Sequence, residues 1–159
     1  MVTYKWLESK RSIILIMRLI DNKTVTDFER LININLEVLS GYKFAAEIIN
    51  DKNLREVFII YIQRLSEYMN ELKRIEKDWL GNKKKFNYPE RKFSFLSCNN
   101  EITILRMCAN LEEKSIKEYE IILHDEIPSN IKDMFLKQYN GVREVQLHMN
   151  VLGDKYYFL

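Results

Sequence analysis

Apolar residues recur at every third or fourth position in four long stretches of this chain. Such spacing places them on one face of an α-helix, because an α-helix repeats about every 3.6 residues. The four stretches run from residues 24 to 49, 54 to 80, 99 to 123 and 128 to 152. Amphipathic helices of this kind bury their apolar faces against one another. The pattern therefore predicts an all-α protein built as a four-helix bundle.

Residues that cap helices indicate where each element begins and ends. The expected starts are the capping pairs Thr24–Asp27 and Asn53–Glu56, then Asn99 or Asn100, and Pro128 in the first turn of the fourth helix. The expected ends of the second and fourth helices are Gly81 and Gly153. These limits predict an N-terminal extension (1–22), a bundle (23–153) and an apolar tail (154–159) docked onto it. Met17 is an alternative start of the natural chain.

Composition narrows the class of protein without naming a function. The chain has 159 residues, 47% of them hydrophobic and 30% charged, which is typical of one globular domain. The formal net charge of +2 is too small to require an anionic partner. Two cysteines, Cys98 and Cys108, fit a reducing compartment, and no apolar run approaches the roughly 20 residues that span a bilayer. We therefore expect a cytoplasmic protein.

Residues 82–98 have no helical period and contain Pro89, so they predict a long connection between the second and third helices. Such a length suits a crossover along the bundle. Lysines and aromatic residues alternate here, a mixture that can bind nucleic acid or a membrane surface. We favour the alternative in which the aromatic residues cover the bundle while the lysines stay in water. Binding by this loop would weaken steeply with salt and on neutralisation of Lys83 to Lys85.

Several short motifs occur in a fixed order between about residues 24 and 152. They are Gly41-Tyr42 with Ala45-Ala46-Glu47, Gln63-Arg64, Glu71-Leu72, Glu112-Glu113, Tyr119, Gln138 and Gly141-Val142. In this combination the chain resembles an uncharacterised bacterial family of ferritin-like four-helix bundles. The resemblance implies an antiparallel, ferritin-like bundle. It implies no reaction, because the family has no established one.

A complete two-iron centre is not expected in this chain. Ferritin-like bundles that bind two irons take a Glu from each of two helices and a Glu-x-x-His motif from each of the other two. Neither Glu-x-x-His motif occurs here. The histidines are His124, which lies in a predicted break, and His148, which lies on the flank of the fourth helix. Glu144 and His148 are four positions apart and could pair on the surface, but a solvated helix face is the favoured interpretation.

Polar residues within the apolar stripes are the remaining candidates for chemistry. Glu112 lies inside the third stripe, and a buried carboxylate is costly unless it is paired or binds a metal. One hypothesis is a degenerate site for a single iron or manganese ion, formed by Glu112 with Glu76, Gln138 and Gln146. The favoured one is a buried polar network, such as Glu112 with Arg64, that fixes the helix register. Glu37 is expected on the surface.

Three classes of function remain open. The favoured one is a non-enzymatic bundle that acts through protein contacts, with a homo-oligomer or an unidentified protein as its partner. The second is a bundle that binds iron or manganese at an altered site. The third is binding of nucleic acid or membrane through the 82–98 loop. Metal analysis of protein purified without chelators separates the first two classes, with Glu112→Ala as the diagnostic variant.

Overall fold

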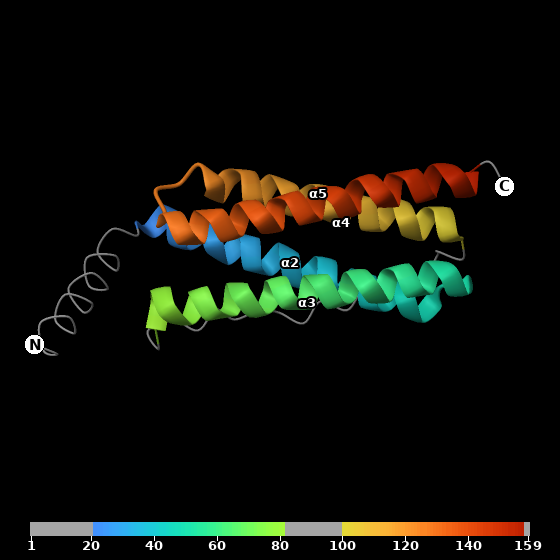
Figure 1. Cartoon of the computed structure of the whole chain (residues 1–159), viewed down its shortest axis with the longest axis horizontal. Coiled ribbons are helices and arrows are strands. Elements are labelled where there is room, and N and C mark those ends of the chain that lie inside the picture. Colours follow the sequence, from blue (N-terminus) through green and yellow to red (C-terminus); the bar gives the residue numbers. More distant parts are fainter. Residues whose placement is uncertain (1–20, 82–99, 158–159) are drawn as a thin grey trace, which may run out of the picture.

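The computed structural model describes residues 21–81 and 100–157 of the chain. Within these ranges it contains no strand and has the helices α2 (Asn22–Ile48), α3 (Lys52–Leu80), α4 (Glu101–Leu123) and α5 (Ser129–Tyr157). The helices lie side by side (Figure 1), and the sequence colours advance in one direction along α2 and α5 and in the other along α3 and α4. The prediction of an all-α bundle is confirmed. The expectations for residues 1–20 and 82–98 lie outside the described residues.

Helix α2 begins two residues earlier than its sequence signal suggested. Asp21 is the N-cap, and its carboxylate accepts a hydrogen bond of 2.7 Å from the amide of Thr24. The predicted Thr24–Asp27 capping box is therefore wrong. The Asp27 carboxylate instead pairs with the side chains of Lys23 and Arg30 while lying almost completely buried. Aspartate and threonine are both good N-cap residues, so the apolar periodicity alone could not show whether Asp21 or Thr24 caps the helix.

The ends of α3 and the start of α4 follow ordinary capping chemistry. Asp51, and not Asn53, caps α3 by accepting a hydrogen bond of 3.0 Å from the amide of Leu54. Gly81 ends α3 at a positive φ of 55°, a conformation that residues with a Cβ avoid, so this prediction is confirmed. Asn100 caps α4, also as predicted, because its side chain accepts bonds from the first free amides of the helix.

Helix α5 differs from expectation at its C-terminal end. Pro128 lies directly before it, and the Pro128 carbonyl accepts the first amide bonds of the helix. Gly153 was expected to stop the helix, but α5 continues through it to Tyr157. A helical glycine costs only about 1 kcal/mol, and Leu152 beside it still packs against the core. Residues 154–157 therefore belong to α5 and not to a separate tail.

All four helices contribute to one hydrophobic core. Each helix contributes a large buried side chain to the same cluster: Phe28 from α2, Phe58 from α3, Leu111 from α4 and Phe135 from α5. At one end of the bundle the Phe28 ring lies 5.3 Å from Trp79 and 6.0 Å from Phe135, measured between ring centroids. No helix in the described ranges is both long and apolar enough to cross a membrane.

The helix pairs do not approach one another equally. The backbones of α4 and α5, of α2 and α4, and of α2 and α3 come closest, whereas α3 and α5 meet mainly through side chains. One such contact is tight, because a Cβ atom built at Gly141 on α5 would lie 2.0 Å from the Tyr68 hydroxyl on α3. Tyr68 therefore occupies the space that a side chain at position 141 would need.

We expect Gly141→Ala to lower the free energy of unfolding by about 1–3 kcal/mol, since the added methyl group would overlap Tyr68. The double variant with Tyr68→Phe should recover part of this loss, because the closest clashing atom is removed. Gly153→Ala is the matched control on the same helix, where an added Cβ meets nothing within 4 Å. Urea denaturation measures all three, and an equal loss at Gly141 and Gly153 would contradict the packing argument.

Candidate functional site

Two groups of polar side chains lie inside the bundle. The first, which we call the hydrogen-bonded layer, consists of Asn35, Glu71, Ser115, Tyr119 and Gln138. Each of the four helices contributes at least one of these residues. The Tyr119 hydroxyl donates to Gln138 Oε1 over 2.7 Å, and Gln138 Nε2 donates to Glu71 Oε2 over 2.6 Å. The layer thus links α3, α4 and α5 by short bonds.

The connection of this layer to α2 runs through Asn35. Ser115 Oγ donates to Asn35 Oδ1 over 3.4 Å, and Asn35 Nδ2 donates to the carbonyl of Leu31 over 2.8 Å. Burial raises the pKa of Tyr119 well above its usual value, so this phenol stays protonated and remains a donor. Because buried polar groups are costly when unpaired, these bonds favour one register of the four helices over shifted ones.

The second group, which we call the Glu112 cluster, consists of Tyr42, Tyr61, Cys108 and Glu112. Glu112 is completely buried, and neither of its carboxyl oxygens has a hydrogen-bond partner. Burial raises the pKa of Glu112 to about 8, an effect partly offset by the neighbouring Tyr42 hydroxyl. That hydroxyl is also buried and forms no hydrogen bond of normal geometry. Glu112 is therefore mainly neutral at pH values below about 8.

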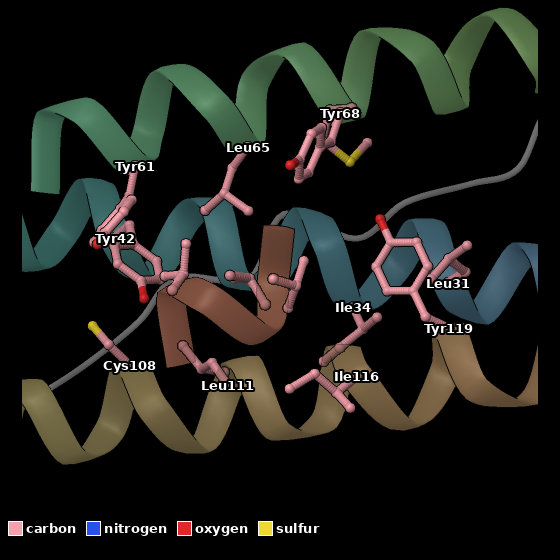
Figure 2. Packing of buried hydrophobic residues seen from close by; sticks show 14 of the residues in the cluster. Leu31, Ile34, Tyr42, Tyr61, Leu65, Tyr68, Cys108, Leu111, Ile116 and Tyr119 are labelled. Carbon is pink, nitrogen blue, oxygen red and sulfur yellow. The ribbon is translucent and has the colours of Figure 1, made fainter. Parts of the chain in front are cut away.

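The other members of the Glu112 cluster link it to the α3–α5 side of the bundle. Figure 2 shows Tyr42 next to Tyr61, with Cys108 entering from α4, and the two tyrosine rings lie 6.2 Å apart edge to face. Burial raises the pKa of the Cys108 thiol, which makes it a weak nucleophile. The Tyr61 hydroxyl shares a hydrogen bond with Nδ1 of His148, an exposed residue of α5.

Arg64 is not the partner of Glu112, so the predicted Glu112–Arg64 pair is wrong. The guanidinium of Arg64 lies 3.4 Å from the carboxylate of Glu144 on α5 and stands over the Tyr61 ring. Arg64 lies on the α5-facing edge of α3, where its guanidinium stays partly exposed and meets the largely exposed carboxylate of Glu144. The His148 ring, which shares the α5 surface with Glu144, contacts the Tyr61 hydroxyl.

Two of the four residues proposed as a metal site, Gln138 and Glu76, lie away from Glu112 along the bundle. Glu112 and Gln138 are buried, while Glu76 and Gln146 are half-buried. Gln138 is bonded to Tyr119, which is seven positions from Glu112 and so about 10 Å along α4. Glu76 is fifteen positions beyond Tyr61, or about 22 Å along α3.

The donor chemistry around Glu112 also fits a metal poorly. Iron and manganese prefer ionised carboxylate or neutral imidazole ligands, whereas the groups beside Glu112 are a phenol and a thiol with raised pKa values. Among the described residues no group of three or more His, Cys, Asp and Glu side chains is placed to hold an ion. Metal binding at Glu112 with Glu76, Gln138 and Gln146 stays a prediction.

The remaining sequence candidates have structural contacts. Glu37, expected on the surface, is only 15% exposed in its side chain and lies 4.0 Å from Lys114. His124 follows the last turn of α4, and its Nδ1 lies 2.6 Å from the Glu120 carbonyl. Cys108 is a free thiol that is buried in the core.

Sequence reasoning did not identify Glu71, Tyr42 or the Tyr61–His148 contact as parts of the interior polar groups. Tyr42 and Tyr61 lie on apolar stripes, where a tyrosine is usually counted as packing. The signal that could have indicated a polar role is the phenol hydroxyl of each tyrosine. It enters an interior that also holds a carboxylate and amides from the other apolar stripes. Glu71 stands beside a buried leucine, which placed it near the interior without naming its partner.

No family model matches this chain, and no curated protein matches it either. The resemblance to ferritin-like bundles accordingly stays a prediction. The chemistry of the interior has to be judged from the chain's own contacts. Of the two polar groups, the hydrogen-bonded layer has its polar atoms engaged, whereas in the Glu112 cluster the Glu112 carboxyl and the Tyr42 hydroxyl form no hydrogen bond of normal geometry.

Proposed function

We propose that this protein is a non-enzymatic, ferritin-like bundle that acts through protein contacts, including contacts between copies of itself. The chain directions in Figure 1 support a ferritin-like topology made of two antiparallel pairs. Helix α2 runs opposite to α3, α4 runs opposite to α5, and α3 and α4 point the same way. That topology requires a connection as long as the bundle between these two helices. Residues 81–100 separate α3 from α4 and are numerous enough to supply it.

The observation that carries the proposal is the hydrogen-bonded layer. Its side chains donate to and accept from one another across the four helices, at the position where a reactive bundle would direct free ligands inward. Gln138 uses both its carbonyl and its amide nitrogen in these bonds. Such an interior supports a rigid scaffold whose function lies on its surface.

Helix α5 offers an outer face for such contacts. Leu147 and Val151 are four positions apart, so they share one face of the helix, and they are 60% and 64% exposed. Apolar side chains that are this exposed and share one helix face can mark a protein–protein contact. We therefore assign the contact between copies to this face of α5.

Self-association should be visible by sedimentation equilibrium as a dimer that forms with rising protein concentration. The double variant Leu147→Lys with Val151→Lys should remain a monomer, because it places two cations on the contact face. Ile121→Lys on α4, where the residue is 38% exposed, is the control and should dimerise as the wild type does. A wild-type protein that stays monomeric throughout would remove this part of the proposal.

The alternative function, binding of iron or manganese, has one supporting feature: the Glu112 carboxyl without a hydrogen-bond partner. Protein purified without chelators is the material for the test. One metal ion per chain that is lost in Glu112→Ala and retained in Glu113→Ala would replace the scaffold proposal. Less than one metal ion per chain in the wild type, in Glu112→Ala and in Glu113→Ala would support the scaffold proposal.

A further inference from the structure

Glu112 lies at the interface of α2 and α4, where it faces Tyr42 from the neighbouring helix. Both side chains are completely buried, and neither the Glu112 oxygens nor the Tyr42 hydroxyl forms a hydrogen bond of normal geometry. The hydroxyl is nevertheless close enough to Glu112 to favour its ionised form, and this effect is smaller than that of burial. We propose that Glu112 is an acid-tightened latch: its protonated form keeps the α2–α4 interface closed, and loss of the proton favours an opened state in which the Cys108 thiol reaches solvent. The proposal is independent of the contacts assigned to α5.

No cation within the described ranges pairs with Glu112. The titratable groups that interact with it are Tyr42 from α2, Tyr61 from α3, and Cys108 and Tyr119 from its own helix, all of them neutral in their usual state. The charged and titratable groups on the α3–α5 side are engaged elsewhere: Arg64 with Glu144, and His148 with Tyr61. An ionised carboxylate in this position would be both desolvated and unpaired, which is the costly case.

The interface beside Glu112 is thinly packed on its outer side. Gly41 and Ala45 of α2 and Met107, Cys108 and Leu111 of α4 line a small apolar pocket there, about large enough for one water molecule. Gly41 and Ala45 have small or no side chains, so they leave this gap between the two helices. Cys108 borders both the pocket and the Glu112 cluster, and its thiol therefore reports the opening.

The direction of the pH effect follows from the two pKa values of Glu112. In the closed bundle burial raises the pKa to about 8, while in an opened, hydrated state it returns towards the ordinary value of 4.5. Between these values the closed state binds one more proton than the open state. The open population therefore rises about tenfold per pH unit from roughly pH 5 to pH 8 and levels off above that. Acid tightens the interface and neutral to mildly alkaline pH loosens it.

Thiol labelling in a Cys98→Ser background, which leaves Cys108 as the sole thiol, tests the latch. At each pH the labelling rate with a disulfide reagent is divided by the rate for the same protein unfolded in urea, which removes the ordinary ionisation of the thiol. The corrected rate should rise about tenfold per pH unit between roughly pH 5 and pH 8 and then become constant. With Glu112→Gln it should be low and independent of pH.

Two controls make the result specific to Glu112. Glu113→Gln changes an exposed carboxylate one position away that pairs with Lys117, and it should leave the wild-type profile unchanged. Tyr42→Phe removes the hydroxyl that lowers the pKa of Glu112, so the profile should level off at a higher pH. The same slope in wild type and Glu112→Gln, or a flat wild-type profile, would overturn the proposal.

Hydrogen exchange decides whether the opening is local. After correction for the intrinsic exchange rate, amides of α2 and α4 near positions 41–48 and 104–111 should show the pH-dependent opening. Amides around Phe28 and Phe135, at the aromatic end of the bundle, should not. Equal pH dependence at both ends would mean that the whole bundle unfolds, and the assignment to the α2–α4 interface would fall. This measurement requires only the wild-type chain.

Discussion

Replacing Glu112 by glutamine is expected to stabilise the protein at about pH 7 and to leave its stability near pH 4.5 almost unchanged. Burial raises the pKa of Glu112 to about 8 from an ordinary 4.5, so the folded wild type holds a proton that the unfolded chain releases. The contribution of Glu112 to the free energy of unfolding is therefore fully present below about pH 4.5 and declines as pH rises towards 8. Above about pH 8 this contribution no longer changes. At pH 7 the decline amounts to about 3 kcal/mol, an upper bound because a buried site relaxes.

Urea denaturation of both proteins at a series of pH values measures this difference directly. The midpoint of the wild type should move to lower urea as pH rises, while that of Glu112→Gln should stay nearly level. Tyr61 and His148 are unchanged in both proteins, so their contribution to stability cancels in the comparison. If the glutamine variant followed the same decline, another group would be responsible and Glu112 would have to be charged and paired in the folded state.

Phe28→Ala is expected to lower the free energy of unfolding by about 3–5 kcal/mol. The Phe28 side chain is fully buried, and its ring contacts Trp79 on α3 and Phe135 on α5. Its removal leaves a cavity where three helices meet and also ends two aromatic contacts. Thermal or urea unfolding gives the magnitude.

The control for this variant is Leu136→Ala, which changes a residue of α5 that is 47% exposed. It should alter stability by no more than about 0.5 kcal/mol. If Phe28→Ala were no worse than Leu136→Ala, the aromatic end of the bundle would not be packed as the ring distances indicate.

Periodicity alone was sufficient to locate the helices, and it failed at their ends for identifiable reasons. Phe58 and Phe135 lie where the apolar spacing placed them, because helical geometry fixes which residues share a face. The start of α2 was misplaced because Asp21 and Thr24 are both good caps and only the chain path selects one. Gly153 was misread because a glycine that costs little in a helix is tolerated when its neighbours pack.

The interior site was only half predictable. The position of Glu112 in an apolar stripe correctly placed it in the core. Its neighbours depend on the rotation and spacing of the other helices, which no single helix encodes. From its place on α3, Arg64 could reach inward or towards α5. It turns towards α5 because the Glu144 carboxylate lies there and pairs with it. Residues whose partners lie on another helix are therefore the ones that sequence reasoning paired wrongly.

The tight fit of Tyr68 over Gly141 has an evolutionary consequence. The residue at position 68 limits which side chains fit at position 141, and the reverse also holds. A substitution at one position is therefore tolerated only with a suitable residue at the other. Orthologues that carry a larger amino acid at 141 should have lost the phenol at 68 in the same lineage. Covariation between these two sites would then mark the boundary between α3 and α5 in any descendant of this chain.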